Sequence, residues 1–285
     1  MSSLTANEFM AIAEIIQERS GLRLTMDKLY LMETRLTPFA RRRGMPSYES
    51  LIREVLLNPN DSLLTEIVEA MMTNETFFFR DGSPFEAFGQ KILPFLKTHK
   101  KNSQQIRIWC AACSTGQEPY SLAMMFAENA HEWKDWSIEI LATDISSIPL
   151  SRAKQGLYTQ FEVQRGLPIN LLIKYFTQIQ DSWQISDTIK KMVTIRQFNL
   201  LDSLSVLGNF DIIFCRNVLI YFDIETKLNV LEALSQQLEP QGIVVLGSAE
   251  TVLGITSKLQ PSKDMRGFYT SPGSAVSSAI AASAA

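Results

Sequence analysis

The chain is poor in the residues on which thiol, histidine and metal chemistry depend. Its 285 residues include three cysteines, which cannot all pair within one chain, and two histidines. His99 and His131 do not have the spacing of metal ligands. The sequence therefore predicts no resident metal and no disulfide framework.

Targeting and membrane signals are also missing. The opening residues, MSSLTANEFM, lack the basic start and apolar stretch of a secretory signal. No apolar run approaches the roughly 20 residues that span a bilayer. A net charge of −3 gives no reason to expect nucleic-acid binding. The sequence predicts a cytoplasmic, monomeric protein that binds no nucleic acid and does not insert into membranes.

Apolar side chains with a 3.6-residue period predict an all-helical domain over residues 1–72. Phe9, Ile12 and Ile16 fall on one helix face that ends at Gly21. The same period continues through 26–44 and, after a break, through two further segments, the last with Asp61 as its expected N-cap.

Strands alternating with helices predict a doubly wound, Rossmann-like α/β sheet over residues 99–272. The expected strands are 105–110, 137–144, 209–217 and 242–250, with 265–271 as an added edge strand. Residues 73–98 are expected to be a linker and cofactor lid. The Ser/Ala-rich tail, 273–285, is expected to be disordered.

Residues 157–198 interrupt this alternation. The runs KYFTQI, SWQIS and MVTIRQF alternate with period two and are separated by polar turn residues. They predict a small antiparallel β subdomain inserted into the sheet domain.

The stretch IWCAACSTGQEPYSLAM, residues 108–124, predicts a strand, a tight turn and a helix N-terminus. Such a junction binds anions through free N–H groups and the helix dipole. A dinucleotide fingerprint needs three glycines, and only Gly116 stands in this turn, which disfavours NAD and FAD. A cofactor with an amino-acid end fits better, its carboxylate on the N–H groups and its ammonium on Glu118. A plain strand–helix junction is the alternative.

The same stretch contains a C-x-x-C pair, Cys110 and Cys113. A redox pair opens a helix, whereas this one ends a strand, and no second pair or nearby histidine completes a zinc site. We expect these cysteines to be small buried side chains.

Polar residues end two further strands. Asp144 stands where doubly wound folds bind ribose hydroxyls, although it could equally cap the next helix. Arg216 and Asn217 end the third strand, and Tyr221 follows at helical spacing. These residues predict a binding crevice; a helix cap at Asn217 over a packed Tyr221 is the alternative.

The segment TNETFFFRD, residues 73–81, joins the two predicted domains. Its aromatic residues and Arg80 are typical of a lid that excludes water and meets a carboxylate. A linker packed on the core is the alternative.

Basic residues are concentrated between Arg19 and Arg43, where seven stand against two acidic ones. Such a run is either a solvated face or a docking surface for an acidic partner. The candidate docking residues are Arg35, Arg41, Arg42 and Arg43.

Five strings, TNETFFFRD, WCAACSTGQEPYSLAM, ILATDIS, FNLLD and FDIIFCRNVLIYFD, occur in this order behind the helical domain. On the basis of these five strings, the chain resembles the CheR-type chemoreceptor glutamate methyltransferases, and the resemblance extends over about residues 5–272. The resemblance implies S-adenosylmethionine as methyl donor, S-adenosylhomocysteine as product and the cytoplasmic domain of chemoreceptors as partner. The basic helical face would dock the receptor.

The resemblance also implies roles for single residues. Arg80 and Tyr221 would lie near the transferred methyl group and orient the acceptor. The implied cofactor contacts, together with the turn glycine, are Asn74, Thr76, Arg80, Gly116, Glu118, Asp144, Asn199, Leu200, Arg216 and Asn217.

Two departures from the family pattern stand out. The loop FTQIQDSWQISDTIKKMV is short and lacks the glycines of versions that grip a tethering peptide of the receptor. Gln117 replaces a more common acidic residue beside the retained Glu118. A small-molecule methyltransferase and a non-catalytic S-adenosylmethionine sensor are competing hypotheses.

Overall fold

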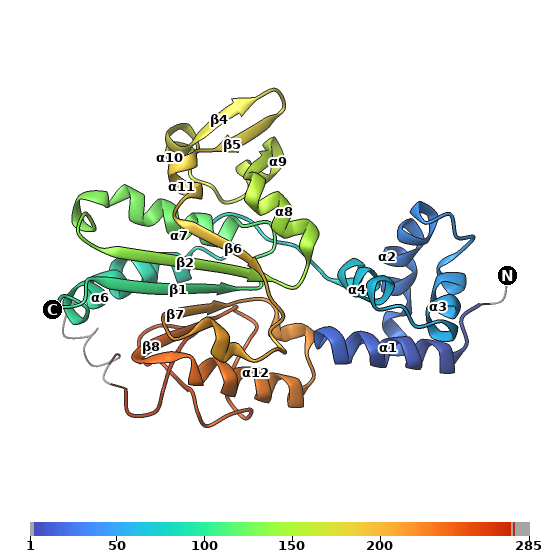
Figure 1. The fold of residues 1–285 in the computed structure, drawn as a ribbon. Coiled ribbons are helices and arrows are strands. Elements are labelled where there is room, and N and C mark those ends of the chain that lie inside the picture. The colour runs from blue at the N-terminus through green and yellow to red at the C-terminus, as the bar shows by residue number, and fades with distance from the viewer. Residues whose placement is uncertain (1–2, 275, 277–285) are drawn as a thin grey trace. The chain divides into compact units, whose positions relative to one another are not determined.

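The computed structural model describes residues 3–274 and 276, and Figure 1 shows their fold. The chain divides into two compact units. One comprises residues 1–73 together with 221–226, and the other comprises 74–220 and the chain from 227 onward. Each unit is described by itself.

The first unit is all helical, as predicted. Thr5 and Glu8 form a capping box at the start of the first helix, and Gly21 ends it with a left-handed φ of 76°. The last helix is capped by Asn60, one residue before the expected Asp61. The helices are α1 (Ala6–Ser20), the 3₁₀ turn η1 (Met26–Lys28), α2 (Leu29–Arg42), α3 (Tyr48–Leu57) and α4 (Asp61–Met71).

Residues 221–226 pack with this helical unit. The backbone N–H of Arg23 donates to the carbonyl of Tyr221 at 2.9 Å, and Gln17 Nε2 donates to Asp223 Oδ2 at 2.6 Å. A Cβ on Gly21 would lie 2.8 Å from the ring of Phe222, so only glycine fits against this ring.

The second unit is built on a seven-stranded sheet in the order β6-β2-β1-β7-β8-β10-β9. Five strands are parallel, and β10 runs antiparallel to both β8 and β9. This confirms the predicted doubly wound, mostly parallel sheet. The strands are β1 (Gln105–Ala111), β2 (Ser137–Asp144), β6 (Val193–Gln197), β7 (Phe210–Cys215), β8 (Leu238–Leu246), β9 (Gln260–Pro261) and β10 (Phe268–Thr270).

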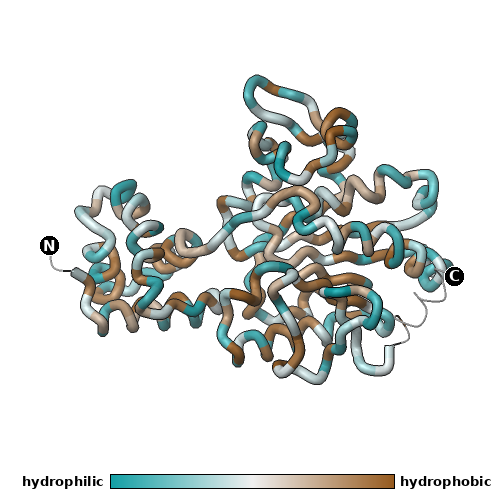
Figure 2. The backbone as a smooth tube through the Cα atoms, turned by 180° about the vertical axis from the view of Figure 1, so that it is seen from behind, coloured by the Kyte–Doolittle hydropathy of each residue, from teal (hydrophilic) through white to brown (hydrophobic). Residues whose placement is uncertain are grey.

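Hydrophobic stretches run along the central strands of this sheet (Figure 2). Alternate β1 side chains, Ile106, Ile108 and Cys110, belong to one buried cluster with residues of the flanking helices. On the opposite face of β1, Trp109 packs on Phe210 with ring centroids 5.4 Å apart.

The helices of the sheet unit outside the insertion are α5 (Ser83–Ala87), the π-helix η2 (Phe88–Ile92), α6 (Leu93–His99), α7 (Gln117–Glu128), α8 (Ser147–Gln155) and α12 (Ile224–Gln236). The short 3₁₀ turns are η3 (Ala130–Glu132), η4 (Leu204–Leu207) and η5 (Leu219–Tyr221).

A small antiparallel sheet, in the order β3-β5-β4, is inserted between β2 and β6, as expected. One part of that prediction is wrong. The run 192–198 contributes β6, which pairs in parallel with β2 at the edge of the main sheet. Period-two alternation marks a strand but does not say which sheet it joins. The insertion contains β3 (Leu157–Thr159), α9 (Gln160–Gln164), α10 (Ile169–Tyr175), β4 (Phe176–Ile179), β5 (Ser182–Ile185) and α11 (Asp187–Lys190).

Three boundaries differ from the sequence expectation. Residues 83–98 of the expected linker are helical, and their Phe85, Phe88 and Phe95 are part of the core cluster. The strand expected at 242 begins at Leu238. Most of the tail predicted to be disordered lies outside the described residues, although Val276 is described and buried. Within the described ranges, no helix is both long and apolar enough to cross a bilayer.

Candidate active site

The loop between β1 and α7 bends sharply at the carboxyl edge of the sheet. Ala112, Ser114 and Gly116 all have positive φ, at 59°, 51° and 91°. A Cβ on Gly116 would lie 2.9 Å from Ala153 Cβ and 3.1 Å from the Tyr120 ring, so glycine is required there. Among the described residues, no side chain caps the first turn of α7. The free N–H groups of this turn remain suited to an anionic group.

Asp144 ties this loop to the end of β2. Its carboxylate is buried and accepts from the backbone N–H of Ser114 at 2.8 Å and of Ser146 at 2.9 Å. The N-cap position of α8 is Ser146, so Asp144 is not the N-cap residue that the alternative required. Each carboxylate oxygen has two acceptor sites, so a carboxylate at this place can accept from several donors at once.

The cysteine pair lies inside the protein. All three cysteines are free and buried. Burial raises the pKa of the Cys110 and Cys113 thiols well above the usual value, which is the opposite of a reactive thiolate.

We therefore expect the native thiols to react with Ellman's reagent at least about a hundredfold more slowly than the same thiols in denaturant, because burial excludes both reagent and thiolate. Stopped-flow absorbance with and without guanidinium chloride measures this. One thiol that reacts rapidly in the native protein would restore the redox interpretation.

Three charged side chains of the sheet unit, Arg216, Glu118 and Asp81, meet at the end of β7. Arg216, whose side chain is 1% exposed, donates through Nη1 to Glu118 Oε2 at 2.8 Å. Its Nη2 donates to Asp81 Oδ2 and to the carbonyl of Arg80, both at 2.8 Å. Burial raises the pKa of the Glu118 carboxyl above its usual value, and Arg216 opposes that rise. This cluster joins α7, β7 and the segment that follows the helical unit.

The segment 74–82 lies over the β1–α7 junction. Ser114 Oγ donates to the carbonyl of Asn74 at 2.7 Å, and Phe79 N–H donates to Ser121 Oγ at 3.0 Å. Three residues here, Phe79, Asp81 and Gly82, have positive φ. Such a strained backbone is typical of functional segments.

The three consecutive phenylalanines have different surroundings. Phe78 is fully buried against Tyr158, with ring centroids 5.0 Å apart, so the core-packing interpretation holds for it. Phe77 is half-buried, with the guanidinium groups of Arg80 and Arg165 at 5.5 and 4.3 Å from its ring centre. Arg80 also donates to the carbonyl of Glu75 at 2.8 Å. Thr76, beside them, is half-buried.

The remaining cofactor candidates lie in loops at the same edge of the sheet. Asn199 and the buried Leu200 follow β6, where Phe198 N–H donates to the carbonyl of Asp144 at 2.9 Å. Asn217 follows β7 with a φ of 60°. It is not the N-cap of a helix, because η5 begins at Leu219 and α12 at Ile224.

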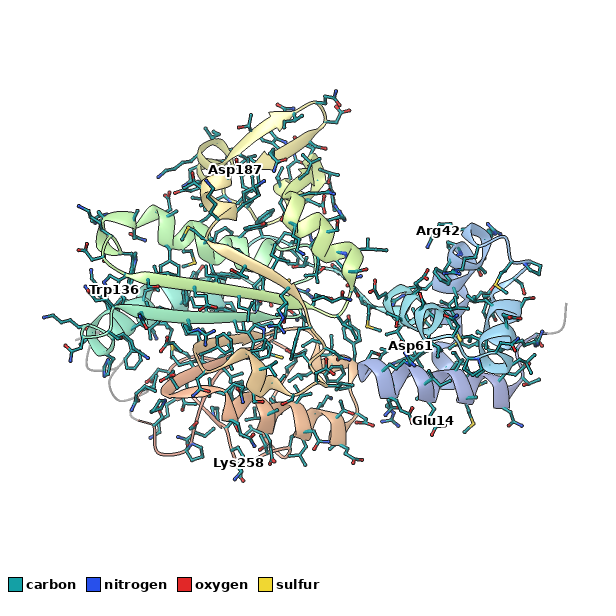
Figure 3. All side chains as sticks on the ribbon, viewed as in Figure 1. Glu14, Arg42, Asp61, Trp136, Asp187 and Lys258 are labelled. Atoms are coloured by element: carbon teal, nitrogen blue, oxygen red, sulfur yellow. The ribbon has the colours of Figure 1, made fainter. Side chains whose placement is uncertain are left out.

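Two sets of predicted residues are not part of this cluster. Tyr221 belongs to the segment that packs with the helical unit. Of the docking candidates, Arg35 is half-buried and donates to the carbonyl of Met71 and, at 2.6 Å, to Thr73 Oγ1. Arg41, Arg42 and Arg43 are exposed on the helical unit, where Figure 3 labels Arg42.

Sequence reasoning missed Asp81 and Glu250. Asp81 follows Arg80 directly and binds Arg216, 135 positions away. Glu250 is buried and accepts from three backbone N–H groups. The available signal for Glu250 was a charged residue only a few positions after the end of a buried strand, β8, which ends at Leu246.

The cluster suits a ligand that combines hydroxyls, an ammonium and a carboxylate. Asp144 can accept hydroxyls and Glu118 can face a cation. Arg216 Nε is buried and lacks a hydrogen-bond partner among the described residues, so it can bind an anionic oxygen. The residues present thus fit S-adenosylmethionine. No three His, Cys, Asp or Glu side chains in the described part of the chain are grouped to hold a metal ion.

Family models match both units of the chain. Residues 7–72 match the all-alpha domain of CheR methyltransferase, and residues 74–268 match its SAM binding domain. A chemotaxis protein methyltransferase of Vibrio parahaemolyticus is 37% identical over 90% of this chain and 94% of that protein. Chemotaxis protein methyltransferase 1 of Pseudomonas aeruginosa is 37% identical over 91% of this chain and 95% of its own.

Solved structures resemble the chain only distantly. PKMT2 from Rickettsia typhi in complex with AdoHcy shares 18% identity at a TM-score of 0.35, over 56% of this chain and 25% of that one. The two family models follow each other along the chain in the order that the sequence predicts, the helical domain first and the S-adenosylmethionine-binding domain second. The chain therefore belongs to the CheR family of chemotaxis protein methyltransferases, S-adenosylmethionine-dependent enzymes that methylate glutamate side chains of proteins.

Proposed function

We propose that this enzyme forms methyl esters on glutamate side chains in the cytoplasmic domain of chemoreceptors and so adjusts their signalling. The observation that carries the proposal is the match of both units, in order, to the two domains of one chemotaxis methyltransferase family. The proposal includes a monomeric enzyme in the cytoplasm, where those receptor domains lie.

The cofactor site consists of the residues gathered at the carboxyl edge of the sheet. When bound, S-adenosylmethionine supplies a methyl group on a positively charged sulfur. Glu118 would face the ammonium, Asp144 would accept the ribose hydroxyls, and Arg216 would hold the Glu118 carboxylate in place through their ion pair. The other residues that line the site are Asn74, Thr76, Arg80, Gly116, Asn199, Leu200 and Asn217.

The acceptor needs orientation rather than activation. A glutamate carboxylate, with a reference pKa of about 4.3, is already ionised at neutral pH. The carboxylate oxygen would attack the methyl carbon as the methyl–sulfur bond breaks, and the thioether S-adenosylhomocysteine would leave. Opposite charges are neutralised in that step, so exclusion of water and alignment dominate the rate. Arg80, with one of its five N–H donors on the Glu75 carbonyl, is suited to bind the acceptor carboxylate. Tyr221 is proposed as a second residue that orients the acceptor.

Transfer of tritiated methyl groups to a receptor cytoplasmic fragment tests the function. We expect label that mild base releases as methanol, because esters hydrolyse where N-methyl and thioether groups do not. Base-stable label, or label only on small molecules, would point to the small-molecule hypothesis. Cofactor binding without turnover on any receptor would support a sensor.

The docking surface for the receptor is proposed to be the exposed residues Arg41, Arg42 and Arg43. Arg43 also pairs with Glu66. The guanidinium groups of Arg42 and Arg43 lie over the ring of Phe39, and both residues remain exposed to solvent. Arg35 is better explained as a structural residue that stabilises the end of α4, because it donates to Met71 and Thr73.

Arg41→Glu combined with Arg42→Glu is expected to raise KM for the receptor fragment about tenfold, with kcat unchanged, because like charges then meet an acidic partner. The wild-type KM should rise with salt and that of the variant should not. Arg266→Glu, on the exposed surface of the sheet unit, is the matched control. Equal KM values in both variants would refute the docking surface.

A further inference from the structure

A tight turn follows β8 beside the site and ends in a buried carboxylate. The N–H of Glu250 donates to the carbonyl of Gly247 at 3.0 Å, while the N–H of Gly247 donates back to Glu250 Oε2 at 2.7 Å. The turn is thus closed by its own backbone and by its own side chain. Glu250 lies where β7 and β8 end next to each other.

The same carboxylate binds the loop that leaves β7. Asn217 N–H donates to Glu250 Oε2 at 2.8 Å, and Ile220 N–H donates to Oε1 at 3.3 Å. One buried anion therefore accepts from three backbone donors of two neighbouring loops. Charge-assisted bonds of this kind are about twice as strong as neutral ones.

The bound loop has an unfavourable backbone. Asn217 adopts a φ of 60°, a region that residues other than glycine seldom occupy. Its side chain also lies close to the turn, because a Cβ on Gly247 would be 2.7 Å from Asn217 Nδ2. Both contacts hold Asn217 in place, and Arg216, which binds Glu118, is the preceding residue.

We propose that Glu250 is a positioning residue for the cofactor site. Its carboxylate fixes residues 216–220 so that Arg216 meets Glu118 and Asn217 lines the site. Glu250 itself touches backbone N–H groups, not the reacting atoms. The inference deepens the proposed function and rests on it for the identity of the ligand.

A carboxylate is required because its partners are all donors. In Glu250→Gln one acceptor oxygen becomes an NH₂ group, which also donates. Whichever way the amide turns, at least one of the three N–H groups loses its acceptor and faces another donor. A buried donor without a partner destabilises its own loop rather than the whole sheet.

Hydrogen–deuterium exchange of the free protein, read by mass spectrometry, tests whether Glu250 fixes residues 216–220, and it needs no cofactor. In Glu250→Gln we expect the amides of 216–220 to exchange at least about tenfold faster, while peptides from β1 and β2 keep wild-type protection. Calorimetry should show the dissociation constant of S-adenosylhomocysteine rising about tenfold or more. Glu239→Gln, at the opposite end of β8, should change neither quantity.

Unchanged exchange of 216–220 in Glu250→Gln would overturn the inference whatever the protein binds. Faster exchange with unchanged affinity for S-adenosylhomocysteine would overturn it too, because the loop would then not serve the site. If the wild type bound no S-adenosylhomocysteine at all, the proposed function would fail. The exchange rates alone would then show whether Glu250 fixes residues 216–220.

Gly247→Ala provides a second variant that keeps the carboxylate and adds one methyl group, whose carbon would lie 2.7 Å from Asn217 Nδ2 and 2.8 Å from Glu250 Oε2. It should weaken S-adenosylhomocysteine binding by a similar factor, even if Glu250→Gln folds poorly. Wild-type affinity in this variant would contradict the proposed placement of Asn217.

Discussion

Arg216→Met is expected to weaken binding of S-adenosylhomocysteine about a hundredfold and to lower the free energy of unfolding by about 3–5 kcal/mol. The guanidinium is almost fully buried and binds Glu118, Asp81 and the carbonyl of Arg80. Methionine fills a similar volume but leaves the Glu118 carboxylate buried without its counter-charge. Breaking a buried pair in this way is far more destructive than losing a surface pair.

The pKa of Glu118 gives this prediction a pH dependence. Burial already raises that pKa above the usual value of 4.5, and loss of Arg216 would raise it further. The folded state then holds the proton more tightly than the unfolded chain. The resulting stability is present below the unfolded pKa and is lost as the pH rises through the folded pKa. Arg216→Met should therefore be more destabilised, relative to wild type, at pH 8 than at pH 5.

Urea unfolding at both pH values and calorimetry with S-adenosylhomocysteine measure these effects. Arg152→Met is the matched control, because Arg152 pairs with Glu162 at 2.9 Å on a half-exposed surface. It should change the unfolding free energy by less than about 1 kcal/mol and leave affinity unchanged. An Arg216→Met protein with affinity within threefold of wild type would contradict the assigned role.

Asp144→Ala is expected to weaken S-adenosylhomocysteine binding by about a hundredfold. The change removes a proposed acceptor for the ribose hydroxyls and releases the N–H groups of Ser114 and Ser146. Because Ser114 lies in the β1–α7 loop, part of the loss reflects disorder in that loop.

A cofactor analogue separates the two causes. Wild type should bind 2′,3′-dideoxy S-adenosylhomocysteine about tenfold or more weakly than the parent compound, whereas Asp144→Ala should bind both equally. Asp135→Asn, exposed near the start of β2, is the control and should behave as wild type. If Asp144→Ala still discriminated between the two ligands, Asp144 would not hold the ribose.

The sequence alone predicted those features that depend on residues close together in the chain. Gly116 marked the turn because a strand becomes a helix around a single glycine, and Asp144 marked a strand end because the apolar run stops there. The alternation of strands and helices predicted the parallel sheet. These features depend on neighbours within a few residues.

What remained hidden depends on contacts between distant parts of the chain. Nothing near Arg216 in the sequence points to Glu118, 98 positions earlier, or to Asp81. The edge position of β6 depends on its pairing with β2, and Arg35 looked like a surface charge until its bonds to Met71 and Thr73 were seen. Hydrophobic period and motif spacing contain no information on such pairings.

The central claim of the mechanism is that the enzyme orients an already ionised carboxylate and moves no proton. The measurement that tests it is the single-turnover rate of methyl-ester formation on a receptor fragment between about pH 6 and 9, for wild type, Arg80→Ala and Tyr221→Phe. We predict slower transfer in both variants, by about tenfold or more, with rates that stay level across this range in all three proteins, because the acceptor is ionised throughout. A wild-type rate that rises through a pKa near 7, and loses that dependence in either variant, would contradict the account.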